Sequence, residues 1–243
     1  MIARNPSLTD QVKANLKERI VDGEFAEGRI PAESDLAADL GVSRTTVRDA
    51  LGRLEQEGAI YRRQGSGTFV NEPGLQIKSR LEEIWSYEKV LLDHGYVPSV
   101  RLLGVDRELA SESLAAELDI EVGSEILLME KLFLEDDVPV VLTFNRIPVQ
   151  HLDGDDFDAT GGEPVYEFLE ANSDRRLGYY LSEIIPVALP KAEANRLDVP
   201  AGTPAISFEE IAFDQDNRPV VHATSFFRDD LLRFRLIRRN TGA

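Results

Sequence analysis

The sequence predicts an α+β protein of two modules: a helical N-terminal module that ends in a β-hairpin, and a C-terminal mixed module with a largely antiparallel sheet. Helical apolar spacing dominates the first 58 residues, whereas short β-like runs separated by turns begin at Val100. Charge divides in the same way, because residues 1–72 hold 10 basic and 12 acidic residues and residues 73–243 hold 17 basic and 32 acidic ones. This asymmetry indicates modules with different partners.

Composition excludes several classes of site. The 243 residues include no Cys and only three His, so disulfides, thiolate zinc sites and a Cys nucleophile are excluded, and we expect no metal and no cofactor. The first ten residues lack the apolar segment of a secretion signal. The longest uncharged apolar run, residues 184–190, is too short to span a bilayer. We therefore expect a cytoplasmic protein without membrane contact.

Three helices are predicted in the N-terminal module from apolar spacing and stop signals. Residues 8–22 carry an apolar side chain at every fourth position. A turn at residues 28–31 leads into a second helix, which Gly41 ends. Ser43 caps a third helix, which runs to Gly58. Two helices joined by a short turn that contains glycine form a helix-turn-helix pattern.

A β-hairpin is predicted directly after the third helix. Residues 59–63 and 68–70 have the pattern of short strands, and Gln64-Gly65-Ser66-Gly67 has the pattern of a glycine-rich turn between them. The helices and this hairpin together predict a winged helix-turn-helix module over residues 1–72.

The start of the third helix, Ser43-Arg44-Thr45-Thr46-Val47-Arg48, has the chemistry of a phosphate-binding surface. A helix N-terminus exposes unpaired N–H groups and a partial positive charge, and the hydroxyl and guanidinium groups here add donors. Arg can also pair with guanine O6 and N7. An isolated Arg pair more often marks a solvated helix face, but here the cap, the turn and the hairpin all agree. We therefore expect this helix to enter the major groove of DNA.

Strands and helices alternate in the C-terminal module, which we place at residues 81–243 after a linker over residues 73–80. Residues 231–237 fit either a final strand or a helix. The other predicted strands are residues 101–108, 125–134, 138–147, 179–189, 205–213 and 219–228, and the predicted helices are residues 111–118, 165–172 and 191–197.

One segment of the C-terminal module occurs twice. Leu118-Asp119-Ile120 followed by Gly123-Ser124 recurs as Leu197-Asp198-Val199 followed by Gly202-Thr203. A predicted hairpin follows each copy, with an offset of 79 residues before the hairpin turn and 80 after it. A helix–hairpin unit used twice predicts a pseudo-twofold sheet, and a crevice between two such halves is a natural ligand site.

The N-terminal module closely resembles the winged helix-turn-helix domain of GntR-type repressors. The resemblance covers about residues 8–71 and rests on Pro31-Ala32-Glu33, on the Gly-Val-Ser-Arg-Thr-Thr-Val-Arg string of residues 41–48, and on residues 65–70. It implies DNA contacts by Ser43, Arg44, Thr45, Thr46, Arg48, Gln64 and Gly65.

The C-terminal module resembles the UTRA effector-binding domain, which follows a GntR-type head in the HutC-like branch and has a chorismate-lyase-like fold. The match covers about residues 79–239 and rests on Glu130-Lys131 before an acidic turn, on Tyr166 and on the tail Ser225-Phe226-Phe227-Arg228. The resemblance implies an effector site, and the candidate contacts are Ser99, Lys131, Thr143 and Tyr166. The alternative interpretation is a solvated Lys131 and a core Tyr166.

The effector predicted for this module differs from a sugar phosphate. Members of the resembled family that bind sugar phosphates usually carry two Arg on the first hairpin, where this chain has Lys131 and Phe133. A single Lys offers a point charge instead of a bidentate fork. We hypothesise an effector that is less anionic or more apolar than a sugar phosphate.

The leading function is a DNA-binding transcriptional regulator, expected to be a repressor, whose binding to double-stranded operator DNA is controlled by a small-molecule effector. We expect a homodimer, because one head contacts a single half-site. The alternative is an enzyme, since the C-terminal module resembles a lyase-like fold; no catalytic residues are assigned, because fold alone carries no chemistry. A structural DNA-binding protein without a ligand is a third interpretation.

Overall fold

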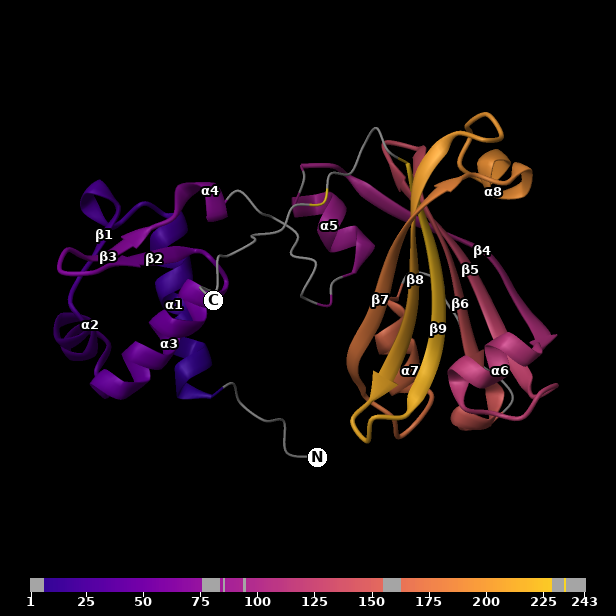
Figure 1. The fold of residues 1–243 in the computed structure, drawn as a ribbon, viewed down its shortest axis with the longest axis horizontal. Coiled ribbons are helices and arrows are strands. Elements are labelled where there is room, and N and C mark those ends of the chain that lie inside the picture. Colours follow the sequence, from indigo (N-terminus) through magenta and orange to yellow (C-terminus); the bar gives the residue numbers. More distant parts are fainter. Residues whose placement is uncertain are drawn as a thin grey trace. The chain divides into compact units, whose positions relative to one another are not determined.

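A computed structural model describes residues 7–75, 84, 86–93, 95–154, 163–228 and 234 of the chain. These residues form two compact units, which we call the N-terminal unit (residues 7–75) and the C-terminal unit (residues 84–234), and each is described by itself (Figure 1). The predicted linker over residues 73–80 lies partly outside the described residues, as does most of the predicted final element over residues 231–237. No helix in the described ranges is long and apolar enough to cross a membrane.

The three predicted helices of the N-terminal unit are confirmed. Ser7 and Ser43 cap the first and third helices by accepting a backbone N–H, and Gly41 ends the second in a left-handed conformation at φ 65°. Fully buried Leu16 and Leu51 lie in the core that the three helices share. The helices are α1 (Leu8–Val21), α2 (Glu33–Leu40) and α3 (Arg44–Gln56).

A three-stranded antiparallel sheet completes this fold, in the order β1-β3-β2. The predicted hairpin is present as β2 (Ile60–Arg63) and β3 (Gly67–Val70). The prediction of a simple turn at residues 28–31 was wrong: after the 3-10 turn η1 (Ala26–Gly28), β1 (Arg29–Ile30) pairs with β3. Ile30 is buried in the helical core, and this burial stabilises the extended conformation of the two-residue strand.

A short helix, α4 (Glu72–Leu75), joins the first residues of the predicted linker to the N-terminal unit. The Asn71 side-chain amide donates to the Gly58 carbonyl at 2.8 Å. Gly74 lies against the same carbonyl, so that a Cβ built on it would stand 1.9 Å from the Gly58 oxygen. Residues 73–75 therefore pack with the N-terminal unit.

The C-terminal unit has the predicted α+β architecture around one antiparallel sheet of six strands, in the order β4-β5-β6-β9-β8-β7. All of the predicted strands and helices between residues 101 and 228 are present, with boundaries within a few residues of those expected. In chain order the elements are α5 (Tyr87–Asp93), β4 (Pro98–Leu109), α6 (Glu112–Leu118), β5 (Glu125–Glu135), β6 (Val138–Pro148), η2 (Val149–His151), α7 (Val165–Ala171), β7 (Leu177–Ala188), α8 (Lys191–Arg196), β8 (Pro204–Asp214) and β9 (Pro219–Arg228).

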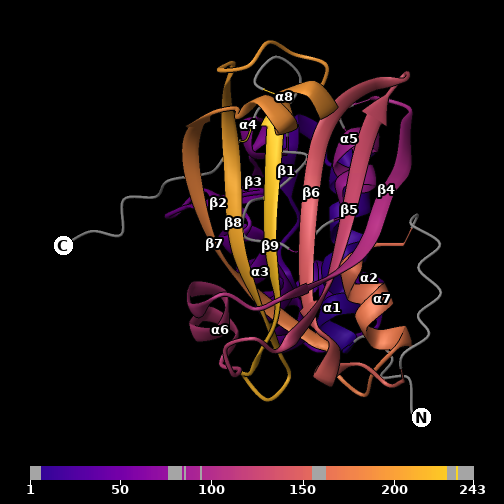
Figure 2. The same cartoon turned by 90° about the vertical axis from the view of Figure 1, so that its right-hand side faces the viewer.

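Helices cover both faces of this sheet. Figures 1 and 2 show α5 and α7 on one face and α6 and α8 on the other. The alternation of side chains along β5 follows this division. Met129 and Phe133 lie in the clusters that contain residues of α7 and α5, whereas Ile126 and Leu132 lie in those that contain residues of α6 and α8. The sheet is thus the middle layer of three.

The predicted internal repeat is visible in the topology. Helix, strand, helix and hairpin follow one another as α5-β4-α6-β5-β6 and again as α7-β7-α8-β8-β9. The central strands β6 and β9 pair antiparallel, and Phe144 lies opposite Thr224. These two residues are 80 positions apart, which is the repeat offset after the turn. Each strand therefore pairs with its own counterpart around Phe144, and the pseudo-twofold axis passes through this pair.

Candidate functional site

The N-terminal end of α3 is exposed and well capped. The Ser43 hydroxyl accepts from the Thr46 backbone N–H at 3.1 Å, and the two hydroxyl oxygens of Ser43 and Thr46 lie 2.8 Å apart. Ser43, Arg44 and Thr45 are exposed and Thr46 is half-buried, while Val47 in the next position is fully buried. The core side of the helix is thus fixed, and its first turn presents donors to solvent.

Arg48, one turn further along α3, is exposed but paired. Its Nη2 lies 3.1 Å from Glu33 Oε2, and its Nε donates to the same oxygen at 3.1 Å. Glu33 is the first residue of α2, so the pair joins the two helices of the helix-turn-helix. A phosphate that approaches Arg48 meets the Glu33 carboxylate beside it.

The turn of the β2–β3 hairpin carries the other predicted DNA contacts. Gln64 and Gly65 are exposed, and Gly65 has a φ of 73°, which favours glycine. Arg29 of β1 donates to the Ser66 carbonyl at 3.3 Å, so strand β1 supports the turn. Arg62 of β2 pairs with Glu55 of α3 at 3.1 Å. The seven predicted residues thus form two groups, one at the tip of α3 and one at the hairpin turn.

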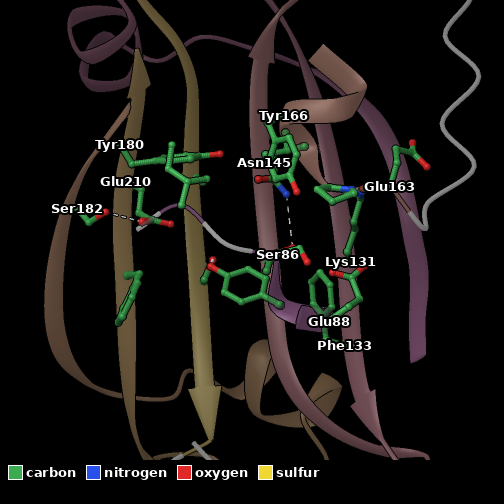
Figure 3. Close-up of a pocket in the computed structure, with 18 of the residues that line it drawn as sticks. Ser86, Glu88, Lys131, Phe133, Asn145, Glu163, Tyr166, Tyr180, Ser182 and Glu210 are labelled. Carbon is green, nitrogen blue, oxygen red and sulfur yellow. Dashed lines mark hydrogen bonds between the residues drawn. The ribbon is translucent and has the colours of Figure 1, made fainter. Parts of the chain in front are cut away.

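A cavity of about 790 Å³ lies in the C-terminal unit on the sheet face that α5 and α7 cover. Figure 3 shows side chains from α5, β5, β6, β7 and β8 around it. Its size is in the range of small-molecule sites, which run from about 300 to 1,000 Å³. Aromatic rings and polar groups share its lining.

Three of the four predicted effector contacts line this cavity. Lys131 of β5 and Thr143 of β6 are buried and lie opposite each other in the strand register, and Tyr166 reaches the cavity from α7. The fourth, Ser99, is exposed on β4 opposite Leu134 and does not line the cavity. The structure thus brings Lys131, Thr143 and Tyr166 together and leaves Ser99 apart.

Lys131 is the cation among the described residues of the lining, and only 2% of it is exposed. Its Nζ donates to the Glu163 carbonyl. Burial lowers the Lys131 pKa, and the nearby carboxylates of Glu163 and Glu88 oppose this effect. Burial also raises the pKa of Glu88, whose Oε2 is buried and has no hydrogen-bond partner among the described residues.

Glu210 of β8 lies in the opposite half of the cavity. It accepts a hydrogen bond from the Ser182 hydroxyl of β7, its neighbour in the strand register. Burial raises the pKa of Glu210, although the Ser182 hydrogen bond partly offsets this. Burial and the Glu210 charge also raise the pKa of Tyr180. A half-buried carboxylate and two hydroxyl groups thus mark this end of the cavity.

Sequence reasoning missed Glu210 and Tyr87, although the repeat offers a signal for both. Glu210 stands 79 residues after Lys131, and Tyr87 stands 79 residues before Tyr166. All four line the cavity. Tyr87 donates to Ser225 Oγ at 2.7 Å, and its burial raises its pKa well above the usual range. Applying the repeat offset to Lys131 and Tyr166 therefore finds their counterparts across the pseudo-twofold axis.

A second, shallower recess lies on the other face of the sheet, beside α6. His222 Nε2 lies 3.1 Å from Glu117 there, and Arg146 pairs with Glu108 at 2.8 Å. No group of three or more metal-ligating side chains is found within the described ranges.

Two family models match the chain. The model described as bacterial regulatory proteins of the gntR family matches residues 8–70, and the UTRA domain model matches residues 93–233. The chain is similar to the HTH-type transcriptional repressor NagR of Bacillus subtilis (strain 168), with 29% identity over 225 residues that span 92% of this chain and 91% of that protein.

Solved structures match this chain across the residues of both units. The crystal structure of PhnF from Mycobacterium smegmatis is 28% identical, with a TM-score of 0.60, and the match covers 94% of this chain and 99% of that one. The structure of the possible transcriptional regulator YydK from Bacillus subtilis has a TM-score of 0.74 and covers 97% of this chain and 100% of that one. YydK is 18% identical, so this likeness shows the fold alone.

Proposed function

Because this chain belongs to the GntR family of bacterial regulatory proteins and carries a UTRA domain, we propose that the α3 tip and the hairpin turn contact operator DNA, and that a small molecule in the 790 Å³ cavity controls this contact. The family consists of DNA-binding transcription regulators, so the enzyme alternative is abandoned. We further propose that the chain is a repressor, like the relatives that carry this word in their names.

One observation supports the DNA contacts above all others. The first turn of α3 is exposed and cationic, while the same helix buries Val47, Leu51 and Leu54 in the core. The helix therefore presents its N-terminal end in a fixed orientation, which suits insertion of that end into a major groove. Ser43, Arg44, Thr45, Thr46 and Arg48 act from this end, and Gln64 and Gly65 act from the hairpin turn.

Control by an effector requires a ligand that binds two arrangements of the protein with different affinity. The cavity supports this role, because its walls come from both halves of the pseudo-twofold sheet and from two helices, α5 and α7. A ligand that contacts Lys131, Thr143 and Tyr166 touches β5, β6 and α7 at once. It can therefore favour one relative position of these elements over another.

We propose that the chain acts as a homodimer in the bacterial cytoplasm. A single α3 reads one half-site, and two symmetric copies read a pseudo-palindrome, which is the usual solution for this motif. The mainly acidic C-terminal part repels DNA, so the cationic α3 tip and the hairpin are the parts of the chain that approach the duplex.

Arg44→Ala tests the DNA contacts. The DNA is a duplex selected from a random library by the full-length protein, and the measurement is its dissociation constant by fluorescence anisotropy at fixed salt. If Arg44 makes a bidentate base contact, the substitution costs about 1–3 kcal/mol of binding free energy. The matched control is Arg53→Ala in the last turn of α3, where Arg53 pairs with Asp10 away from the tip. Equal affinities of Arg44→Ala and the control would contradict the proposed interface.

A further inference from the structure

The two halves of the cavity carry different charges at equivalent positions. Tyr87 and Tyr166 are related by the repeat and place an aromatic ring on each side. Lys131 and Glu210 are related by the same offset of 79 residues, yet one is a cation and the other an anion. The pseudo-twofold symmetry of the backbone is therefore broken by charge where a ligand binds, and a ligand in this cavity has one preferred orientation.

Strand register places these two charges far apart across the sheet. Lys131 of β5 lies opposite Thr143 of β6, which lies opposite Ser225 of β9. Ala223, two residues before Ser225 on β9, lies opposite Glu210 of β8. Three strand spacings of 4.7–4.9 Å separate β5 from β8, or about 14 Å between backbones. No ion pair joins the two side chains, and Figure 3 shows them on opposite sides of the cavity.

The described lining is acidic overall. It contains the carboxylates of Glu88, Glu163 and Glu210 and the single ammonium group of Lys131. Glu88 and Glu163 are the carboxylates whose charges act on Lys131, so the Lys131 end is compensated from within the protein. Glu210 accepts a hydrogen bond from the Ser182 hydroxyl, and no cation of the described lining forms an ion pair with it.

The surroundings of Glu210 suit a positively charged group. Phe208 is two residues before Glu210 on β8 and points to the same face, and Tyr180 and Tyr87 lie close enough for the Glu210 charge to raise their pKa values. A cation that approaches a half-buried carboxylate relieves its desolvation cost, and the faces of aromatic rings attract cations further.

We propose that the effector is an organic cation, whose protonated amine binds Glu210 between the aromatic rings and whose other end presents a hydrogen-bond acceptor to Lys131. This inference rests on the proposed function, since it assigns the chemical class of the ligand in the same cavity. Lys131 has further N–H donors besides the one on the Glu163 carbonyl, because an ammonium group has three. A doubly charged phosphate is disfavoured, because it would meet three carboxylates and no arginine fork in the described lining.

Three probes on one ring scaffold test the class of ligand. Benzylamine is a cation, benzyl alcohol is neutral and phenyl phosphate is an anion, and all three are small for a cavity of this size. Their dissociation constants from the full-length protein are measured by isothermal titration calorimetry at constant ionic strength. We expect benzylamine to bind roughly tenfold or more tightly than benzyl alcohol, as a charge-assisted hydrogen bond implies, and phenyl phosphate to bind most weakly.

Glu210→Gln identifies the group responsible. It keeps the shape and a hydrogen-bond partner for Ser182 but removes the charge, so the preference for benzylamine over benzyl alcohol is expected to disappear. The matched control is Glu183→Gln, which removes an exposed carboxylate next to Ser182 on the opposite face of β7. In this control the preference for benzylamine remains. If Glu210→Gln fails to fold, Lys131→Met in its place is expected to retain the preference for the amine.

The outcomes separate the ligand class from the regulator function. The proposal of an organic cation is overturned if the three probes behave equally, which includes no binding of any of them, or if phenyl phosphate binds more tightly. It is also overturned if the preference for benzylamine survives Glu210→Gln. Affinity for the selected duplex is measured on the same preparations. If the wild-type chain does not bind DNA with sequence selectivity, the proposed function is contradicted, whatever the relative affinities of the three probes.

Discussion

Arg48 Nη2 lies 3.1 Å from Glu33 Oε2, so the carboxylate at the start of α2 holds a guanidinium group at the surface that we assign to DNA. More than half of the Arg48 side chain is exposed, and a surface pair of this kind contributes only about 0–1 kcal/mol to stability. The pair therefore matters for DNA binding more than for folding, since Glu33 repels the phosphate that Arg48 attracts.

Glu33→Gln is expected to strengthen DNA binding. The substitution frees Arg48 and removes a negative charge near the phosphates, so that the dissociation constant for the selected duplex falls by about threefold to tenfold at low salt. Arg48→Ala has the opposite effect and reduces the slope of log affinity against log salt concentration by about 1. Anisotropy titrations at several salt concentrations measure both effects.

The control for Glu33→Gln is Glu24→Gln, which removes a carboxylate paired with Arg19 in the same unit. Its effect on DNA affinity is expected to stay within about twofold, because Glu24 pairs with Arg19 and not with a residue assigned to DNA, and salt screens distant exposed charges. Weaker binding by Glu33→Gln than by wild type would show that Glu33 orients Arg48 for DNA, and would reject the competition described above.

Two substitutions at Ser43 distinguish the contribution of this residue to the stability of α3 from its contribution to DNA binding. Its hydroxyl caps the helix through the Thr46 N–H, and Asp is as good a cap as Ser. Ser43→Ala is expected to lower the free energy of unfolding of the N-terminal unit by about 1 kcal/mol. Ser43→Asp is expected to keep that stability but to lose most DNA affinity, because it places a carboxylate where a phosphate is proposed to bind. Urea denaturation and anisotropy measure the two properties, and wild-type DNA affinity in Ser43→Asp would place the phosphates elsewhere.

The helices, the cap and the hairpins follow from local patterns in the sequence. The Ser43 cap and the Gly41 helix end are both found where side-chain chemistry requires them. Strand β1 was missed, because Arg29 and Ile30 are too few residues for a pattern and are held by pairing with Thr68 and Phe69, far along the chain. Local patterns thus predict elements that are stable by their own spacing, and not those that depend on a partner strand.

The cavity shows a similar limit. Lys131, Thr143 and Tyr166 were predicted from a resemblance to a family, whereas Glu210 was missed, and the pairing of β6 with β9 is what places it in the same cavity. Ser99 was predicted on the same grounds but lies on the outer strand β4, away from the cavity. A strand pattern indicates which residues alternate, but the order of strands decides which of them share a wall.

Asp214 holds the turn between β8 and β9, and its removal is expected to be costly. It is 3% exposed, accepts from the backbone N–H groups of Asp216 and Arg218 at 2.9 Å, and pairs with Arg175 at 2.7 Å. Burial opposes its ionisation, but these N–H groups and the Arg175 guanidinium outweigh this and lower the Asp214 pKa. Asp214→Ala is therefore expected to lower the free energy of unfolding of the C-terminal unit by about 3–5 kcal/mol.

Urea denaturation of the full-length chain, followed by circular dichroism, measures this loss. Asp216→Ala is the control, since it removes an exposed carboxylate from the same turn and leaves the Asp214 contacts in place. Its free energy of unfolding is expected to stay within about 0.5 kcal/mol of wild type, as for other surface substitutions. Equal losses in the two variants would show that the turn, and not the buried pair, accounts for the stability.

His151 makes the stability of the C-terminal unit depend on pH. Burial, together with the nearby Arg175 charge, lowers its pKa from 6.5 to about 4, although the Asp214 carboxylate acts in the opposite direction. The folded state keeps this imidazole neutral, whereas the unfolded state takes up a proton below pH 6.5. The stabilising contribution is therefore complete above pH 6.5 and is lost as the pH falls towards 4. After allowance for partial exposure, the loss is about 1–2 kcal/mol.

His151→Phe removes this titration while keeping a planar ring. Urea denaturation of wild type and variant at several pH values between 4 and 7 measures the difference in their free energies of unfolding. Changes in packing shift the variant equally at every pH, so only the slope of the difference against pH reports the titration. We expect wild type to lose stability relative to His151→Phe as the pH falls below 6.5, and parallel curves over this range would show that His151 ionises freely in the folded chain.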